Sequence, residues 1–349
     1  MSAGAEAPVP EARARANWVL VLLPLALIAV VALAVKLCGA DPAAAFRALV
    51  RGAAGSRVGW GESLSRAAVL AFSGLAVALS FRAGLFNIGA EGQMAAGMAA
   101  GAAMGVKVLG AGTPGAVALP LVLLSGALAG AAWSSIAAAL KQWRGVSEVI
   151  VTLMLNAVAL KLLALLTSYD GLLKNPAEVH QQSAPLPAGA TLAAWGGTSF
   201  HAGVFLALPV AGYLYYVMQH TRAGLSVRAA GLNADAAGAC GIPVARVTWA
   251  VFAGSGALAG MGGALVVMAL GYLPNMNPYA DYGYMAIAVA LVAGLHPLGV
   301  LPAALFFGLL ETGARSMERS AGVPSQVVYL VEGLLILALL VRGLRLPGR

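Results

Sequence analysis

Long apolar runs separated by short polar breaks recur along almost the whole sequence. A helix needs about 20 mainly apolar residues to cross a bilayer, because each residue rises 1.5 Å through a hydrocarbon core about 30 Å thick. The pattern predicts an all-α fold, a polytopic transmembrane helix bundle of about ten spans (8–10), with the eighth and ninth short. The expected spans cover residues 18–37, 63–81, 88–109, 116–140, 147–168, 200–219, 247–271, 279–295, 297–312 and 325–341.

Basic residues orient this bundle, because cytoplasmic loops of membrane proteins are enriched in Lys and Arg. An N-terminus in the cytoplasm places a majority of the 21 Lys and Arg inside, and the cluster 47–57 is the main exception. Both termini are then cytoplasmic, as tails at 1–17 and 342–349 around a transmembrane domain at 18–341. The first apolar run is longer than the 7–15 residues typical of a signal peptide's apolar region, which favours a retained span.

Two connections between the expected spans are long. Residues 169–199 contain three prolines and few apolar runs, so we expect an external loop there. Residues 219–246 carry arginines and are expected in the cytoplasm. Their middle part, 226–240, is alanine-rich and predicts a short surface helix, interrupted at Gly231 and Gly238.

Composition supports the membrane assignment. The chain is 60% hydrophobic and 10% charged, whereas about a quarter of the residues of a soluble domain are charged. The net charge of +8 could indicate nucleic acid, but aromatic residues make up 7%, too few for a base-stacking platform, so no nucleic-acid partner is expected. Cys38 and Cys240 fall on opposite sides of the membrane in this topology, so no disulfide is predicted.

Glycine recurs at four-residue spacing inside two of the expected spans. Gly97, Gly101 and Gly105 form one row, and Gly256 and Gly260 form another. Small residues at this spacing let helices approach closely in lipid. We therefore expect both rows to lie at helix–helix contacts.

Several catalytic signatures are absent from the sequence. It contains no G-x-x-x-x-G-K-[ST] loop for ATP, no H-E-x-x-H and no G-x-S-x-G. These absences and the lack of a paired catalytic site argue against an enzyme. An ion-coupled secondary transporter is an alternative, but it would need acidic ligands at mid-membrane, where Glu332 is the best candidate. Glu311 closes the ninth expected span, and the sequence names no partner for it.

The most informative stretch is FRAGLFNIGAEGQ at 81–93, where polar residues and glycines lie between two apolar runs. Non-helical backbone at membrane depth is tolerated only when it is buried in protein or lines a wet cavity. One interpretation is a broken segment that lines a transport pathway. The other is an ordinary turn in which Asn87 and Glu91 cap the next helix.

A second stretch, GVSEVIVTLMLN at 145–156, opens an apolar helix. Ser147 is a candidate cap, and Glu148 suits the positive end of the helix. Asn156 falls near mid-span, where an unpaired amide is costly, so it is expected to face other helices or a polar solute.

A third stretch, AAGLNADAAGACGIPV at 229–244, has small residues that could insert into a groove of a cytoplasmic partner. The alternative is an amphipathic linker at the membrane surface, which its alanines suit less well because they bury little area.

Taken together and in this order, the three stretches resemble the permease subunits of bacterial ABC importers for nucleosides and simple sugars, which are related to the ribose and branched-chain amino-acid permeases. The resemblance runs from about residue 60 to 341, and FNIGAEGQ is its most specific part. Two positions depart from the family's usual pattern, since Ala239-Cys240 is smaller and Ser147 replaces asparagine.

This resemblance implies a multi-pass protein of the bacterial plasma (inner) membrane, in contact with the lipid bilayer. It implies three protein partners: a second related permease subunit, a cytoplasmic ABC ATPase and an extracytoplasmic substrate-binding lipoprotein. ATP binds to the ATPase, so no cofactor is expected on this chain. The coupling segment falls on the loop at 219–246, with Gly231, Asn233, Ala236, Gly241 and Pro243 as the residues that face the ATPase.

The expected cargo is a nucleoside or a related small polar solute, with a simple sugar or a branched-chain amino acid as alternatives. A neutral polar solute needs hydrogen bonds rather than charge along its path. The amides of Asn87, Gln93 and Asn156 are the candidates for that role, and Glu91 and Glu148 are expected to be structural or gating residues near the pathway.

Overall fold

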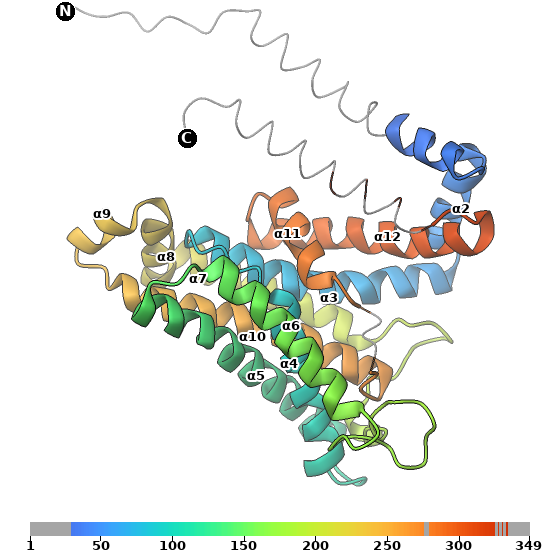
Figure 1. Cartoon of the computed structure of the whole chain (residues 1–349), viewed down its shortest axis with the longest axis horizontal. Coiled ribbons are helices and arrows are strands. Elements are labelled where there is room, and N and C mark those ends of the chain that lie inside the picture. The colour runs from blue at the N-terminus through green and yellow to red at the C-terminus, as the bar shows by residue number, and fades with distance from the viewer. Residues whose placement is uncertain (1–28, 276–278, 325–326, 328–329, 331–332, 334–349) are drawn as a thin grey trace, which may run out of the picture. The chain divides into compact units, whose positions relative to one another are not determined.

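The computed structural model describes residues 29–275, 279–324, 327, 330 and 333, and this part of the chain is helical with no extended strand (Figure 1). A helix at Ala29–Leu37 comes first. The elements that follow are α2 (Pro42–Ala54), α3 (Arg57–Arg82), α4 (Ala90–Ala103), the π-helix η1 (Met104–Val108), α5 (Gly115–Arg144), α6 (Glu148–Thr167), the short 3₁₀ helices η2 (Ala188–Ala190) and η3 (Ala202–Leu206), α7 (Ala207–His220), α8 (Arg222–Leu232), α9 (Ala234–Ala239), α10 (Val244–Leu270), α11 (Tyr282–Val292) and α12 (Pro297–Ala321).

The chain divides into two compact units. One comprises Met1–Gly52 with Gly313–Arg349, and the other comprises Ala53–Thr312. In the first unit, glycines bring α2 close to the end of α12: a Cβ at Gly52 would lie 2.0 Å from the Ser316 Cβ, and one at Gly313 would lie 2.7 Å from the Leu49 carbonyl oxygen. The second unit holds all the candidate site residues.

Helical membrane architecture is confirmed, and six described helices are long and apolar enough to cross a bilayer: α3, α5, α6, the η3–α7 pair, α10 and α12. Ala29–Leu37 and α2, bent by 107° at their junction, would count as a seventh. The expected spans at 18–37 and 325–341 and both tails lie largely or wholly outside the described residues. The count of ten and the cytoplasmic termini therefore stay predictions.

The helix α2 lies outside every expected span, and one expectation about a helix was wrong. Residues 42–54 form α2, a helix of 13 residues that is shorter than a span. The ninth span is not short, since α12 continues for 25 residues, past Glu311 as far as Ala321. The apolar stretch ends at the first polar residues, whereas the backbone hydrogen bonds of the helix continue beyond them.

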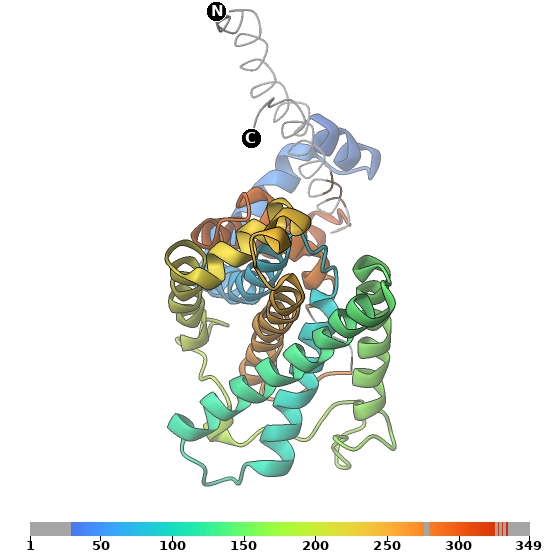
Figure 2. The same ribbon diagram turned by 90° about the vertical axis from the view of Figure 1, so that its left-hand side faces the viewer.

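The centre of the larger unit is built from α4, α5 and α10, which lie alongside one another (Figure 2). A Cβ at Gly97 would lie 2.2 Å from the Gly260 carbonyl oxygen, and one at Gly260 would lie 2.1 Å from the Gly126 carbonyl oxygen. A Cβ at Gly256 would lie 2.2 Å from the Gly130 carbonyl oxygen. The expected helix–helix contact is thus confirmed for Gly97, Gly256 and Gly260, where the helices touch backbone to backbone, whereas a Cβ at Gly105 would meet Leu186 of the connection at 168–201.

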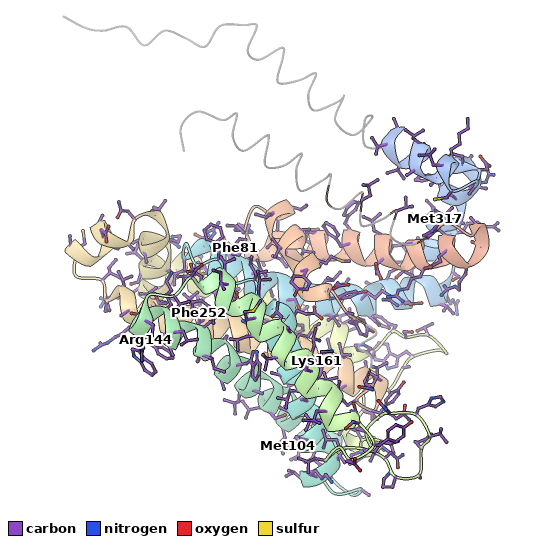
Figure 3. All side chains as sticks on the ribbon, viewed as in Figure 1. Phe81, Met104, Arg144, Lys161, Phe252 and Met317 are labelled. Atoms are coloured by element: carbon purple, nitrogen blue, oxygen red, sulfur yellow. The ribbon has the colours of Figure 1, made fainter. Side chains whose placement is uncertain are left out.

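A non-helical segment joins α3 to α4. The helix α3 ends at Arg82, Gly84 adopts a left-handed conformation (φ +70°), and regular helix resumes at Ala90. Ala83 and Leu85 of this segment are buried in an apolar cluster with Phe252 of α10, which is labelled in Figure 3. This non-helical path agrees with both interpretations of the stretch, and we refer to residues 83–89 as the broken segment.

The connection between α7 and α10 forms a helical hairpin of α8 and α9, which lies at the N-terminal end of α10 (Figure 1). The helix break is at Asn233, whose side chain accepts a hydrogen bond from the Ala236 backbone N–H at 3.0 Å and caps α9. The expectation of breaks at Gly231 and Gly238 was wrong, because both lie within helices. An Asn cap stabilises a helix start, whereas a glycine inside a helix costs only about 1 kcal/mol.

Residues 168–201 form an ordered strap across the other end of α10. Backbone N–H groups of Ser183, Leu186 and Leu192 donate to the carbonyl oxygens of Leu273, Gly271 and Met268, respectively. The imidazole of His201 is buried, and burial lowers its pKa. The strap and the α8–α9 hairpin thus lie at opposite ends of α10, as the predicted topology requires.

Candidate functional site

Three uncharged polar side chains form a buried cluster between the broken segment, α4 and α10. The Gln93 Nε2 donates to the Asn87 Oδ1 at 3.0 Å, and the Asn87 Nδ2 donates to the Ser255 Oγ at 2.9 Å. The Asn87 Oδ1 also accepts from the Gly89 backbone N–H at 2.9 Å. Asn87 and Gln93 are 1% exposed. The cluster therefore satisfies polar groups that would otherwise be costly at membrane depth.

A polar stripe on α6 holds the other side of the broken segment. Glu148, Thr152 and Asn156 are spaced four residues apart and lie on one face of the helix. The Thr152 Oγ1 accepts from the Ile88 backbone N–H at 3.3 Å. The Asn156 Oδ1 accepts from the Gly92 backbone N–H, and its Nδ2 donates to the Ile88 carbonyl oxygen, both at 2.9 Å. Thr152 and Asn156 thus connect α6 to the broken segment and to the first turn of α4.

The first turn of α11 is fixed to three different helices. The Tyr282 hydroxyl accepts from the Arg66 Nη1 of α3 at 2.8 Å, and the Gly283 backbone N–H donates to the Glu91 Oε2 of α4 at 2.7 Å. The Tyr284 hydroxyl accepts from the Asn156 Nδ2 of α6 at 3.1 Å. A Cβ at Gly283 would lie only 2.1 Å from the Glu91 backbone nitrogen. Three successive residues therefore hold the start of α11 against α3, α4 and α6 in turn.

Charged groups inside the larger unit form their own cluster. Arg66 is buried on α3, with its Nη2 2.5 Å from the Glu62 Oε1 and its Nη1 4.0 Å from the Glu311 Oε1. Its guanidinium also lies 5.6 Å from the centre of the Tyr279 ring. The structure thus supplies the partner of Glu311 that the sequence could not name. A buried charge is tolerated when it is paired in this way.

The structure brings together most of the residues expected near the pathway. Asn87, Gln93 and Asn156 all lie around the broken segment, and Glu91 lies beside them. Glu148 lies at the edge of the group, where its Oε2 is 2.8 Å from the Lys141 Nζ. Whether a solute contacts these groups stays a prediction, since the amides bond mainly to the protein itself.

Some expected local roles were wrong. The cap of α4 is Gly89 rather than Asn87, and Ser147 is the N-cap residue of α6 as expected, but its side chain makes no capping hydrogen bond. The Glu91 carboxylate accepts a hydrogen bond from the Gly283 N–H of α11 instead of capping α4. Glu332, the candidate ligand of a secondary transporter, lies outside the described residues.

Sequence reasoning missed Thr152, Ser255 and Tyr284. The four-residue spacing from Glu148 to Asn156 could have found Thr152. Ser255 and Tyr284 carry no local signal, because their partners Asn87 and Asn156 are 168 and 128 positions away in the sequence.

The α8–α9 hairpin contacts the broken segment through glycines. A Cβ at Gly231 would lie 2.1 Å from the Arg82 carbonyl oxygen, and one at Gly84 would lie 3.3 Å from the Gly231 Cα. Of the other residues expected to face a partner, Asn233 and Ala236 make the α9 cap, Gly241 has φ +82°, and Pro243 precedes the first residue of α10. The hairpin therefore lies directly against the turn that leads into the amide cluster.

Replacing Asn156 by leucine is expected to destabilise the fold without removing any apolar contact. The Gly92 N–H and the Ile88 carbonyl would lose their partners, and each buried unsatisfied group costs about 1–3 kcal/mol. We expect a clear drop in the thermal unfolding midpoint of the purified protein in detergent. Met154→Leu, on the exposed side of the same helix, is the matched control and should leave the midpoint unchanged. Equal midpoints for the two variants would contradict the bonding role of Asn156.

Comparison with known proteins shows which family the chain matches. Residues 60–340 match the model of a family described as "Branched-chain amino acid transport system / permease component". The guanosine ABC transporter permease protein NupP of Bacillus subtilis (strain 168) is 34% identical over 314 residues, which cover 88% of each chain. The nucleoside ABC transporter permease protein NupB of Lactococcus lactis subsp. cremoris is 31% identical over 317 residues, covering 87% of this chain and 85% of the relative.

A third relative is named for a sugar. The glucose ABC transporter permease protein TsgB13 of Haloferax volcanii is 34% identical over 331 residues, covering 92% of this chain and 86% of the relative. No solved structure matches the chain.

Proposed function

The chain belongs to the family of branched-chain amino acid transport system permease components, and from this membership we propose that it is the transmembrane permease subunit of an ABC importer that translocates a nucleoside. Membership confirms the expected multi-pass membrane protein of the transport class. The observation that carries the choice of cargo is the similarity to NupP and NupB, which extends over most of each chain.

The polar groups around the broken segment suit a neutral cargo. Asn87, Gln93 and Asn156 bring amides to the interior of an apolar bundle, and the ion pairs of Arg66 are separate from them. We assign these three amides to the substrate pathway, where they lie behind the surface that a solute meets and fix the shape of the broken segment. Glu91 and Glu148 hold the neighbouring helices in place through Gly283 and Lys141.

A simple sugar is the second candidate cargo, and the similarity to TsgB13 favours it. A sugar is also neutral and rich in hydroxyl groups, so the same pathway would suit it. A branched-chain amino acid fits less well, because a zwitterion would need charged partners in the pathway.

Energy would come from a separate subunit. The sequence lacks a phosphate-binding loop, so ATP would bind and be hydrolysed on a cytoplasmic ABC ATPase and this chain would hold no cofactor. The α8–α9 hairpin would dock on that ATPase through Gly231, Asn233, Ala236, Gly241 and Pro243. A second related permease would complete the membrane part, and an extracytoplasmic lipoprotein would deliver the cargo.

Alternating access then depends on the contact between the hairpin and the broken segment. A ligand shifts a conformational equilibrium only by binding the two states with different affinity. ATP would change how the ATPase holds the hairpin, and Gly231 would transmit this change to the turn at Arg82 and Gly84. The broken segment and the amides bonded to it would move as a consequence.

Uptake in a host that lacks its own uptake systems tests this proposal. The chain would be expressed with its partner subunits, with either the active ATPase or an inactive variant, and offered labelled nucleosides, sugars and amino acids. We expect uptake of nucleosides that is lost with the inactive ATPase. ATPase-dependent uptake of sugars alone would select the second candidate, and uptake by this chain alone, driven by an ion gradient, would overturn the importer assignment.

A further inference from the structure

Tyr284 is a partly exposed residue that is bonded to one of the buried amides. Asn87, Gln93 and Asn156 are each 1% exposed, whereas Tyr284 is 37% exposed. Its hydroxyl accepts a hydrogen bond from the Asn156 Nδ2 at 3.1 Å. A solute that approaches the cluster from this side therefore meets the ring and hydroxyl of Tyr284 before it meets an amide.

The hydrogen bonds of Asn156 leave it no donor for a solute. One N–H of its amide donates to the Ile88 carbonyl oxygen and the other to Tyr284, while its oxygen accepts from the Gly92 N–H. A tyrosine hydroxyl can accept and donate at the same time. Because the Tyr284 oxygen accepts from Asn156, its hydrogen remains to donate, and no acceptor for it is found within the described residues.

The position of Tyr284 is fixed before any solute arrives. The two residues before it are bonded to Arg66 of α3 and Glu91 of α4, and its own hydroxyl is bonded to α6. A group held in place in this way loses little conformational entropy when a ligand binds. The site thus offers a preorganised aromatic face with one hydrogen-bond donor at its tip.

We propose that Tyr284 contacts the transported solute and selects for a nucleobase: its ring stacks on the base, and its hydroxyl donates a hydrogen bond to an acceptor on the base. Every nucleobase can stack on an aromatic side chain, because every base has a π face. A free sugar offers hydroxyl groups but no such face. This inference rests on the proposed nucleoside import and adds the residue that recognises the base.

Uptake kinetics of the complete importer test the inference. Guanosine and uridine serve as substrates for the wild type, Tyr284→Phe and Tyr284→Ala, with ribose as the solute that lacks a base. Tyr284→Phe keeps the ring and removes the donor, so KM for the nucleosides should rise by about fivefold, as expected for one neutral hydrogen bond. Tyr284→Ala removes the ring as well, and KM should rise by about tenfold or more. Neither variant should change any uptake of ribose.

Matched controls separate recognition from structure. Tyr213 lies on α7 and is 71% exposed, so Tyr213→Phe and Tyr213→Ala should leave nucleoside KM at the wild-type value. Unchanged nucleoside KM in both Tyr284 variants, or a loss of maximal rate alone, would overturn the role of Tyr284 while wild-type uptake leaves the proposed function intact. Absence of nucleoside uptake by the wild type would instead refute the proposed function, and the inference with it.

Discussion

Replacing Gly231 by valine is expected to reduce ATP-driven uptake strongly while the protein still accumulates in the membrane. The new side chain would meet the backbone at Arg82, because a Cβ at this position lies 2.1 Å from the Arg82 carbonyl oxygen. That atom belongs to the end of α3 and cannot rotate away as a flexible side chain would. The contact through which the hairpin acts on the broken segment would therefore be forced apart.

The size of this effect follows from the coupling that would be lost. Coupling free energies between sites are about 1–3 kcal/mol, so the uptake rate should fall by about five- to 150-fold. The quantities to measure are solute uptake into membrane vesicles, the amount of the chain in the membrane and ATP hydrolysis by the complex. We expect ATP hydrolysis to continue while uptake falls.

Gly212→Val on α7 is the matched control, because a Cβ at Gly212 meets nothing within 4 Å. Both variants carry the same glycine-to-valine change within a helix, so propensity cancels between them. Wild-type uptake by the Gly231 variant would show that the hairpin does not act through this contact.

Replacing Gly260 by leucine should prevent the fold from forming. A Cβ here lies 2.1 Å from the Gly126 carbonyl oxygen and 3.0 Å from the Gly130 Cα, so α10 and α5 would have to separate. Overpacking costs about 1–3 kcal/mol even where side chains can yield. Separation of two backbones also opens the contact of α10 with Gly97 of α4. The total could exhaust a typical stability of about 5–15 kcal/mol.

Size-exclusion chromatography of the detergent-extracted protein measures this result. We expect the Gly260→Leu variant to be absent from the monodisperse peak, whereas Gly212→Leu should elute like the wild type. A monodisperse Gly260 variant with an unchanged thermal unfolding midpoint would be incompatible with the backbone contact.

Much of the helical architecture could be predicted from the sequence, for an identifiable physical reason. Span-length apolar runs and four-residue glycine spacing are local features, and lipid imposes both on the chain. A departure from helix at residues 83–89 was also predictable, because glycines and polar residues interrupt the apolar pattern there, but the pattern fits a broken path and an ordinary turn equally well. The end of α12 was not predictable, because the charged residue Glu311 suggests the end of a span unless its buried partner Arg66 is known.

The site was predictable only in part. Its amides stand out because asparagine is costly in an apolar helix, so Asn87 and Asn156 could be identified from the sequence. The residues that complete the site are ordinary by themselves. Tyr284 is one of nine tyrosines, and its role depends on a hydrogen bond to Asn156, a residue 128 positions away. Contacts of this range depend on the packing of α11 against α4 and α6, which no local pattern encodes.

The strap over the end of α10 has a consequence for how such proteins diverge. Its attachments at Leu186 and Leu192 join backbone N–H groups to backbone carbonyls, whereas Ser183 adds a side-chain bond, because its Oγ accepts from the Leu273 N–H at 2.9 Å. Ser183 and Leu186 are buried, so substitutions can accumulate only at the exposed positions of the strap while its path over α10 stays the same. Val179, which is 85% exposed, is one such position. We expect the strap to be a place where relatives evolve different outer surfaces on an unchanged transport core.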